Sequence, residues 1–313
     1  MSTIEFRKVR DLGQVLNVTF AFIKENLKHL VKNVVLITGP FILLAAAAWI
    51  IVPKDEFVEL DQVDPYDLLI LFGLIFSFLS IFSVVMITAV YQYLLLYQAK
   101  GASSFDTADL FQAILQKIVM VLGTFLGIGL VLGGAFFLVS LLLSTVGALL
   151  GVVGVILSII LVIASFVPLL YFSVIFSLVV IIRLVEGKGF IEAIRRSFFL
   201  IKNHWWETFI VIFVTTLIQS AIGYLISLPL MIYGFAEGVF STTSSASYDQ
   251  FNFLAILYGV SLIINIFTSI IPILAIAFQY YSLVERKESK SLVEQIETVG
   301  NYSVTEEDPE EDY

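Results

Sequence analysis

The chain has 313 residues, of which 59% are hydrophobic and 14% are charged, and its formal net charge is −9. This composition excludes an ordinary soluble domain, in which charged residues make up about a quarter of the chain. The absence of Cys excludes disulfides and thiolate metal sites. The acidic excess belongs to the C-terminal end, because residues 285–313 hold ten acidic side chains against three basic ones. We predict a single membrane domain over residues 1–290 and an acidic, disordered cytoplasmic tail over residues 291–313.

Residues 9–32 are predicted to form an amphipathic helix that lies on the inner face of a membrane. Its apolar side chains recur at helical spacing, and its lysines form a separate row four residues apart. The apolar stripe consists of Leu12, Leu16, Phe20, Ile23, Leu27 and Leu30. The lysine row, Lys24, Lys28 and Lys32, is a candidate contact for anionic lipid headgroups. The alternative interpretation is that this row only fixes the orientation of the chain.

Five long stretches without charge follow in the sequence. About 20 apolar residues are enough to cross the hydrocarbon core of a bilayer, which is roughly 30 Å thick. The stretch at residues 118–182 is long enough for two or three crossings, and we predict two, with a turn near residues 145–151. The six predicted transmembrane helices cover residues 33–53, 67–98, 118–145, 150–182, 207–236 and 251–284.

The positions of Lys and Arg predict how the chain is threaded. Of its 17 Lys and Arg residues, all but Lys54 fall in four patches, at residues 7–32, 100–117, 183–202 and 286–290. Cytoplasmic segments accumulate such residues, and two crossings between successive patches keep all of them on that side. Both termini are therefore predicted inside, and residues 53–66 and 237–250 outside. Residues 1–31 do not resemble a cleavable signal, so the first crossing is expected to act as an uncleaved anchor.

A surface helix followed by two crossings is predicted to occur three times. In the third copy an apolar stripe again advances by three and four residues. That stripe consists of Ile191, Ile194, Phe198, Ile201 and Trp205. The cations Arg195, Arg196 and Lys202 are further candidate contacts for anionic lipid. The middle copy begins at Asp106, a candidate N-cap with Asp109 three residues later.

Side chains within and beside the crossings predict anchors, kinks and polar contacts. Aromatic residues predicted at the membrane surfaces are Trp49, Trp205, Trp206, Tyr280 and Tyr281. The prolines predicted to kink helices are Pro40, Pro168, Pro229 and Pro272. Uncharged polar residues share a face in each of the last two crossings, namely Thr216, Ser220 and Ser227, and Asn265, Thr268 and Ser269. These faces predict either hydrogen-bonded packing or a small polar cavity. The glycines predicted to pack closely are Gly123, Gly127, Gly129, Gly133 and Gly134.

Three short motifs resemble a known membrane family. They are Phe6–Asn17, the pair Gly39-Pro40, and Leu184–Phe198 followed by Trp205-Trp206. On these motifs the chain resembles the glycerophosphoryl diester phosphodiesterase membrane-domain family and its six-helix bacterial relatives, over about residues 5–290. The resemblance implies a membrane domain alone, because six crossings leave no room for the catalytic domain that gives the family its name.

The sequence offers little support for catalysis. Hydrolysis of a phosphodiester needs metal-binding carboxylates and a general acid or base. The two histidines, His29 and His204, fall in predicted surface helices, and no Asp, Glu, Lys or Arg falls inside a predicted crossing beyond its first residue. We therefore expect no enzyme activity, cofactor or metal. The predicted function is a non-catalytic scaffold or lipid-contacting subunit of a bacterial cytoplasmic (inner) membrane, whose partners are phospholipids and an unidentified membrane protein, without nucleic acid. The alternative is a permease for a small neutral or lipidic solute.

Overall fold

A computed structural model of the chain describes residues 4–51, 65–101, 104–240, 259–261 and 263–289. All regular elements in these ranges are helices, and five helical segments are long and apolar enough to cross a membrane. The chain is therefore an all-α membrane protein, as its composition predicted. The helices are α1 (Leu12–Ile51), α3 (Pro65–Lys100), α4 (Thr107–Ser177), α5 (Val179–Glu186), α6 (Phe190–Ile201), α7 (Trp205–Phe240) and α9 (Ile270–Glu288). Most of both predicted outer loops and the whole predicted tail lie outside the described residues.

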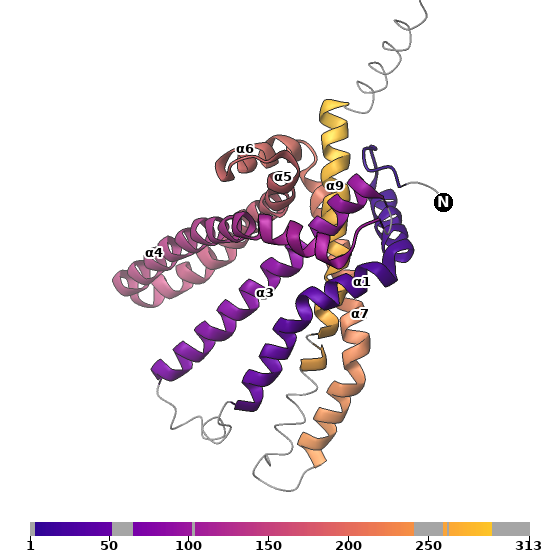
Figure 1. Ribbon diagram of the computed structural model, residues 1–313. Coiled ribbons are helices and arrows are strands. Elements are labelled where there is room, and N and C mark those ends of the chain that lie inside the picture. The colour runs from indigo at the N-terminus through magenta and orange to yellow at the C-terminus, as the bar shows by residue number, and fades with distance from the viewer. Residues whose placement is uncertain (1–3, 52–64, 102–103, 241–258, 262, 290–313) are drawn as a thin grey trace, which may run out of the picture.

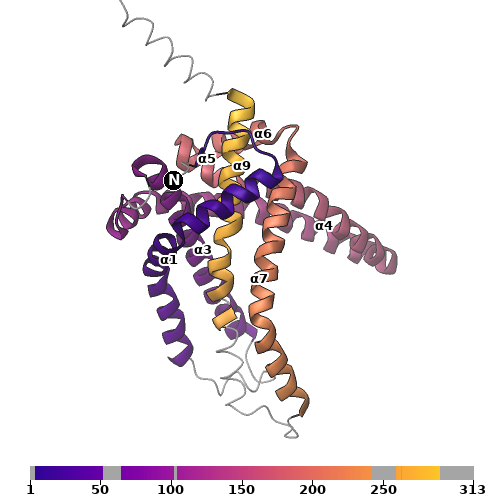
Figure 2. The same ribbon diagram turned by 90° about the vertical axis from the view of Figure 1, so that its right-hand side faces the viewer.

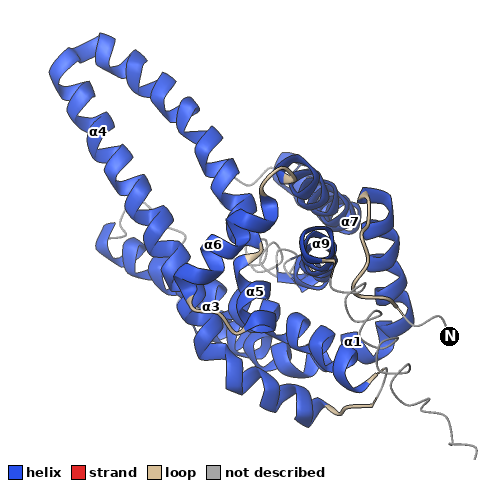
Figure 3. Ribbon diagram, turned by 90° about the horizontal axis from the view of Figure 1, so that it is seen from above, coloured by secondary structure: helices blue, strands red, loops and turns tan. Residues whose placement is uncertain are grey.

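Helix α9 forms the centre of the bundle. The helices α1, α3, α5, α6 and α7 all contact it, and Figure 3 shows it end-on among its neighbours. Leu274, Ala277 and Phe278 have no exposed surface, and burial extends along α9 as far as Glu285. A helix that is enclosed on every side must have protein, rather than lipid or water, around it.

Helix α4 folds back on itself at Gly151. This glycine has a left-handed backbone, with φ of +54°, which an L side chain rarely adopts. Beyond it, the Ser158 hydroxyl donates a hydrogen bond to the Leu143 carbonyl at 3.3 Å. Gly154 lies so close to the Val146 carbonyl that a Cβ at this position would overlap it. The chain thus reverses inside the predicted turn, and α4 is a hairpin of two long arms (Figure 3).

The α4 hairpin leaves the bundle at a steep angle. Figure 3 looks along α7 and α9 but shows the hairpin lengthwise, so the hairpin lies across those helices and not beside them. Contacts at its base hold it there. Arg183 of α5 donates hydrogen bonds to the Met120 carbonyl at 3.1 Å and to the Thr124 hydroxyl at 2.5 Å. Only 6% of the most apolar stretch of the α4 hairpin is buried, against 17% to 39% in the other four candidate crossings. Most of the surface of the hairpin therefore has no protein neighbour.

Basic patches that are far apart in the sequence meet at one end of the molecule. The Arg10 backbone N–H donates to the Ser282 hydroxyl at 2.9 Å, and Lys287 donates to the Lys202 carbonyl at 3.2 Å. Figures 1 and 2 show α5, α6, the end of α9 and the first described residues gathered at this end, while α1, α3 and α7 extend toward the other. The structure therefore brings together segments that the charge pattern assigns to one side of a membrane.

Two of the three predicted surface helices are continuous with the crossing that follows them. Helix α1 starts obliquely across α9 and then bends along the bundle without a break (Figure 2). The middle one is the beginning of α4, with Asp106 as its N-cap and Asp109 accepting a hydrogen bond from the Asp106 N–H at 3.4 Å. Only α6 is separate, because Gly187 and Asn203, both at positive φ, turn the chain on either side of it.

The faces that pack into the bundle match the predicted apolar stripes only in part, because Leu30 and Ile201 belong to both. Thr19 hydrogen-bonds to the Val15 carbonyl of its own helix at 2.7 Å, so it can be enclosed at low cost. In α1 the enclosed row is Val15, Thr19, Phe22, Asn26 and Leu30, and in α6 it is Ala193, Ser197, Leu200 and Ile201. The bulky stripe residues Phe20, Leu27, Ile191 and Phe198 are exposed. The faces toward the bundle thus include small and polar side chains, whereas these four bulky stripe residues face outward.

The four prolines all lie in helices. Pro40, Pro168 and Pro229 lie inside α1, α4 and α7, as predicted. Pro272 instead occupies the first turn of α9, after a turn at Ser269 that separates α9 from the helical segment before it. The first N–H groups of a helix have no partner within the helix, so a proline there costs no hydrogen bond.

We expect Gly127→Leu to lower the stability of the protein by about 1–3 kcal/mol, the usual cost of overpacking. A Cβ on Gly127 would lie 2.6 Å from the ring of Phe190, whereas nothing lies within 4 Å of the same position on the other four glycines predicted to pack closely. Gly129→Leu in the same arm is therefore the matched control. The apparent melting temperature in one detergent should fall for the first variant alone. Equal values would show that α6 does not rest on this arm.

Candidate functional site

A pocket of about 420 Å³ lies at the charged end of the bundle. Its lining comes from α5, α6, α9, the loop between α5 and α6, and the segment before α1. The lining residues are Arg7, Val185, Glu186, Lys188, Arg196, Tyr280, Tyr281, Val284 and Glu288. The walls are apolar and aromatic, and the charges are three cations and two carboxylates. Pockets of this size hold small molecules in other proteins.

The carboxylate of Glu186 organises the charges of this pocket. Its Oε1 accepts hydrogen bonds from Arg196 Nε at 3.0 Å and from the Tyr280 hydroxyl at 2.9 Å. Its Oε2 pairs with Lys188 Nζ at 2.7 Å. Glu186 ends α5, and the left-handed Gly187 that follows turns the chain back, so that Lys188 reaches this carboxylate. One carboxylate therefore holds donors from the loop, from α6 and from α9.

Arg196 links α5 to α9 through two ion pairs. Besides Glu186, its guanidinium pairs with Glu288, and it lies over the ring of Phe199. Burial lowers the pKa of Arg196, but the two carboxylates outweigh burial and raise that pKa above its usual value. The structure corrects the assignment of Arg196 as a surface contact for lipid, because its donors face protein carboxylates and its side chain is only 12% exposed.

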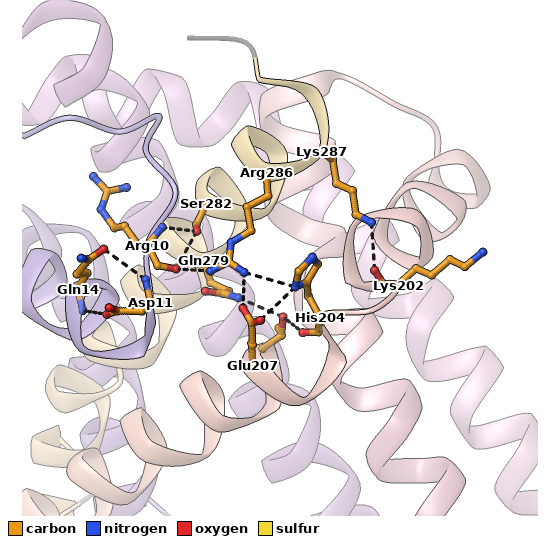
Figure 4. Close-up of polar contacts among 11 residues, drawn as sticks. Arg10, Asp11, Gln14, Lys202, His204, Glu207, Gln279, Ser282, Arg286 and Lys287 are labelled. Carbon is orange, nitrogen blue, oxygen red and sulfur yellow. Dashed lines mark hydrogen bonds and ion pairs between the residues drawn. The ribbon is translucent and has the colours of Figure 1, made fainter. Parts of the chain in front are cut away.

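A second polar cluster joins the chain start to α7 and α9 (Figure 4). Arg286 Nη2 donates to the Arg10 carbonyl at 2.9 Å, and its Nη1 pairs with Glu207 Oε2 at 2.9 Å. Glu207 Oε1 lies 3.2 Å from His204 Nδ1. His204, which was predicted to lie in a surface helix, is therefore part of a contact between helices. This cluster cross-links three segments that are distant in the sequence.

The remaining predicted lipid contacts lie on the surface. These residues are Lys24, Lys28, Lys32, Arg195 and Lys202, and all of them are exposed. None of them lines the pocket. Contact of these side chains with lipid stays a prediction. Arg195 is adjacent to Arg196 on α6, which makes it a useful control for any role of the pocket.

Two of the five predicted membrane-surface anchors are buried inside the protein. Tyr280 and Tyr281 are 2% and 4% exposed, and Tyr281 donates a hydrogen bond to Gln98 Oε1 at 2.8 Å. Their place before the last basic patch suggested a membrane surface. They belong to α9, however, and every face of that helix meets protein.

The tryptophans of the predicted anchors differ in their surroundings. Trp205 stacks on Tyr171 and donates its indole N–H to the Tyr171 carbonyl at 3.3 Å, so it ties α7 to the base of the α4 hairpin. Trp206 is 69% exposed, as a membrane-surface anchor requires. The side chain of Trp49 lies outside the described residues.

The two predicted polar faces meet through hydrogen bonds. Gln219 Nε2 donates to Asn265 Oδ1 at 3.1 Å, and the hydroxyls of Ser227 and Ser261 lie 2.8 Å apart. Thr268 and Ser269 bond to carbonyls of their own helix, Ser220 is partly exposed and Thr216 is exposed. These contacts favour packing over a cavity. Gln219 and Ser261 were not among the predicted polar residues, although Ser261 precedes Asn265 by one helical turn.

His29 belongs to a row of hydrogen-bonded side chains that was not predicted from the sequence. Asn33 Oδ1 accepts a hydrogen bond from the Thr107 hydroxyl at 2.5 Å, so the Asn33 amide nitrogen faces His29 Nε2, at 3.2 Å. We therefore place the imidazole proton on Nδ1, which donates to the Tyr93 hydroxyl at 2.9 Å. These hydrogen-bonded side chains join α1, α3 and the start of α4. The spacing of His29 and Asn33, one turn apart, was the available signal.

Comparison with protein-family models, curated proteins and solved structures finds no match for the chain. Within the part of the chain that the structure describes, no group of three His, Asp or Glu residues is placed to hold a metal ion. The pocket at the charged end, where fixed cations lie beside apolar walls, is the candidate site among the described residues.

Proposed function

We propose that the protein is a non-catalytic scaffold or lipid-contacting subunit of a bacterial inner membrane. The observation that carries this proposal is the exposed apolar surface of the α4 hairpin. Leu130, Leu149 and Val152 in its two arms are 77%, 82% and 79% exposed, and the described chain covers little of their surroundings. Apolar surface of this extent needs lipid or another membrane protein against it.

Six crossings with both termini in the cytoplasm are part of the same proposal. The gathering of basic segments at one end supports this orientation, because such segments resist translocation. The single reversal at Gly151 supports two crossings by residues 118–182. These two crossings require the hairpin to align with the bundle in a bilayer, whereas a hairpin that stays across α7 and α9 would lie within the plane of the membrane. Both placements leave α6 on the cytoplasmic side.

Membership in the glycerophosphoryl diester phosphodiesterase membrane-domain family is also a proposal. Glu186 and Lys188 of the third motif line the pocket, and Arg10 of the first motif belongs to the second polar cluster. Two of the three motifs thus contribute residues to the two polar clusters at the charged end. The permease alternative is not carried forward, because four residues of the polar faces that suggested it make hydrogen bonds within the protein, namely Ser227, Asn265, Thr268 and Ser269.

Purification in native nanodiscs, followed by mass spectrometry, tests the scaffold proposal. We expect the protein to copurify with anionic phospholipid and with a membrane protein in a fixed ratio. Protein that emerges alone and without lipid would contradict it.

We expect the purified protein not to hydrolyse glycerophosphodiesters. Glu207 and His204 form the acid and base pair nearest to a catalytic arrangement, but Arg286 occupies Glu207 Oε2. Phosphate release from a glycerophosphodiester, coupled to a phosphomonoesterase, measures the activity. Hydrolysis that persists through several columns, is lost in Glu207→Gln and is retained in Glu192→Gln would sink this prediction.

A further inference from the structure

We propose that the acidic segment at residues 306–312 binds the lysine row of α1, Lys24, Lys28 and Lys32, within the same chain and competes there with anionic lipid. The lysine row belongs to the described residues, whereas the acidic segment lies outside them. The contact between segment and row goes beyond the proposed function and does not depend on it. Only the competition rests on the lipid-contacting function.

The lysine row is an exposed cationic face. Its members are four residues apart, so they recur about every 6 Å along one side of the helix. All three are exposed, and about 3.6 residues per turn place them opposite the enclosed row that includes Phe22 and Asn26. Among the described residues none of the three lysines forms an ion pair. Glu25 is the one carboxylate that neighbours them in the sequence, so the row keeps an excess of positive charge.

The acidic segment carries the complementary charge. Its sequence is Glu-Glu-Asp-Pro-Glu-Glu-Asp, with six carboxylates in seven residues. An extended chain repeats side chains on one side about every 7 Å, which is close to the spacing of the lysines. A chain in that form can therefore offer a carboxylate to each of two or three successive lysines.

The acidic segment can reach the row from the end of α9. Glu306 follows Glu288, the last residue of α9, by 18 residues. A flexible chain of that length spans about 20–25 Å on average. The start of α1 lies beside α9 at the charged end, because the Arg10 N–H donates to the Ser282 hydroxyl there. Lys24 lies about 18 Å along α1 from that start, so the row is within the reach of the segment.

The covalent link makes up for the weakness of each ion pair. A single ion pair between exposed side chains contributes little to any equilibrium. Two groups joined by a short linker, however, meet at an effective concentration on the order of millimolar. Lysines one helical turn apart also repel each other, and a bound polyanion removes that repulsion. Several weak ion pairs are therefore enough to hold the segment on the row at low salt.

Two other binding partners compete in this account. An anionic leaflet attracts the lysine row and repels the acidic segment, so lipid and segment exclude each other. The exposed cations Arg195 and Lys202 of α6 are the rival site for the segment. They are seven residues apart, and Glu192 lies one turn before Arg195. The density of positive charge is therefore higher on the lysine row.

The test measures the distance between segment and row in the full chain. Spin labels on Ala21→Cys, which is exposed one turn before Lys24, and on Thr305→Cys, directly before the segment, report this distance by pulsed electron paramagnetic resonance. The chain has no other Cys, so only these positions are labelled. The protein is placed in phosphatidylcholine nanodiscs that hold one copy each, which excludes the segment of a second copy.

We expect a population with a short distance at low salt that is lost in about 1 M salt, where charges are screened beyond about 3 Å. Lys24→Gln with Lys28→Gln should lower the ratio of bound to unbound segment about fourfold, or about twofold for each exposed ion pair. Arg195→Gln with Lys202→Gln removes two exposed cations of α6 and is the matched control, which should keep the wild-type ratio.

Each other result decides against a part of the proposal. A wild type without the short distance, an unchanged ratio in the row variant, or equal loss in the control overturns the contact. A short distance that appears only between two singly labelled copies in one disc assigns the segment to a second copy and overturns the contact within the chain.

Discs that also contain phosphatidylglycerol test the competition. The population with the short distance should fall in these discs, because lipid takes the place of the segment on the row. An unchanged population upholds the contact within the chain and overturns the competition. The copurification experiment on native nanodiscs tests the lipid-contacting function separately, so the two failures can be told apart.

Discussion

A cysteine introduced at Ser144, at the tip of the α4 hairpin, should react with a membrane-impermeant thiol reagent in intact spheroplasts, and so should a cysteine at Ser244. A cysteine at Arg195 on α6 should not react. The chain has no Cys of its own, so each signal comes from one site. Ser144 and Arg195 are exposed, so their reactivity reports the side of the membrane. Ser197 on the same helix would be uninformative, because its side chain is fully buried and bonds to the Ile175 carbonyl.

The outcomes of this labelling separate the proposed topologies. Arg195→Cys must react after lysis, which is the control for its accessibility. A reactive Ser244→Cys with an unreactive Ser144→Cys would mean that the hairpin lies within the membrane plane, in the direction that Figure 3 shows, and that the chain crosses four times. Reaction at Arg195→Cys in intact spheroplasts would reverse the proposed orientation.

Features set by local sequence could be predicted well. The reversal at Gly151 needs a residue that tolerates positive φ in a long apolar stretch, and the N-cap at Asp106 needs only a short acidic side chain before an apolar helix. Three prolines fall inside helices for the same local reason. The convergence of the basic patches was also predictable, because two crossings between patches return the chain to the same end.

Burial inside the bundle was not predictable from apolar character. Lipid is as apolar as a leucine side chain, so hydropathy does not tell a lipid-facing helix from one enclosed by protein. The α4 segment has the highest mean hydropathy of the five candidate crossings and the smallest buried share. The central helix α9 instead carries Gln279, Ser282 and the tyrosines that were placed at the membrane surface.

The contacts of the candidate site could not be predicted from the sequence, for a different reason. Spacing places both Arg195 and Arg196 off the apolar stripe of α6, yet only Arg196 meets Glu186 and Glu288. Which of two neighbouring cations turns inward depends on carboxylates ten residues before it and 92 residues after it, since 196 − 186 is 10 and 288 − 196 is 92. Helical periodicity holds no information about partners at such separations.

Glu186→Gln should be the most destabilising single substitution at the charged end. It removes one of two partners from Arg196, whose side chain is only 12% exposed, and the partner of Lys188. Loss of one side of a buried ion pair costs about 3–5 kcal/mol. Glu288 still pairs with Arg196 and water reaches Lys188, so we expect the lower part of that range. A carboxylate at the C-terminal end of α5 is unfavourable, so its removal stabilises the helix by about 0.3–1 kcal/mol. The loss of the ion pairs is larger, so the variant is less stable than the wild type.

The apparent melting temperature of the detergent-solubilised variant measures this effect. Glu192→Gln changes an exposed carboxylate in the first turn of α6 by the same chemistry and should cost at most about 0.3–1 kcal/mol, well below the loss in Glu186→Gln. The double variant Glu186→Gln with Arg196→Met should recover part of the loss, because it no longer leaves a buried cation short of a partner. A double variant less stable than Glu186→Gln would assign the loss to packing and not to the charge, and an unchanged Glu186→Gln protein would show that this carboxylate does not hold the site together.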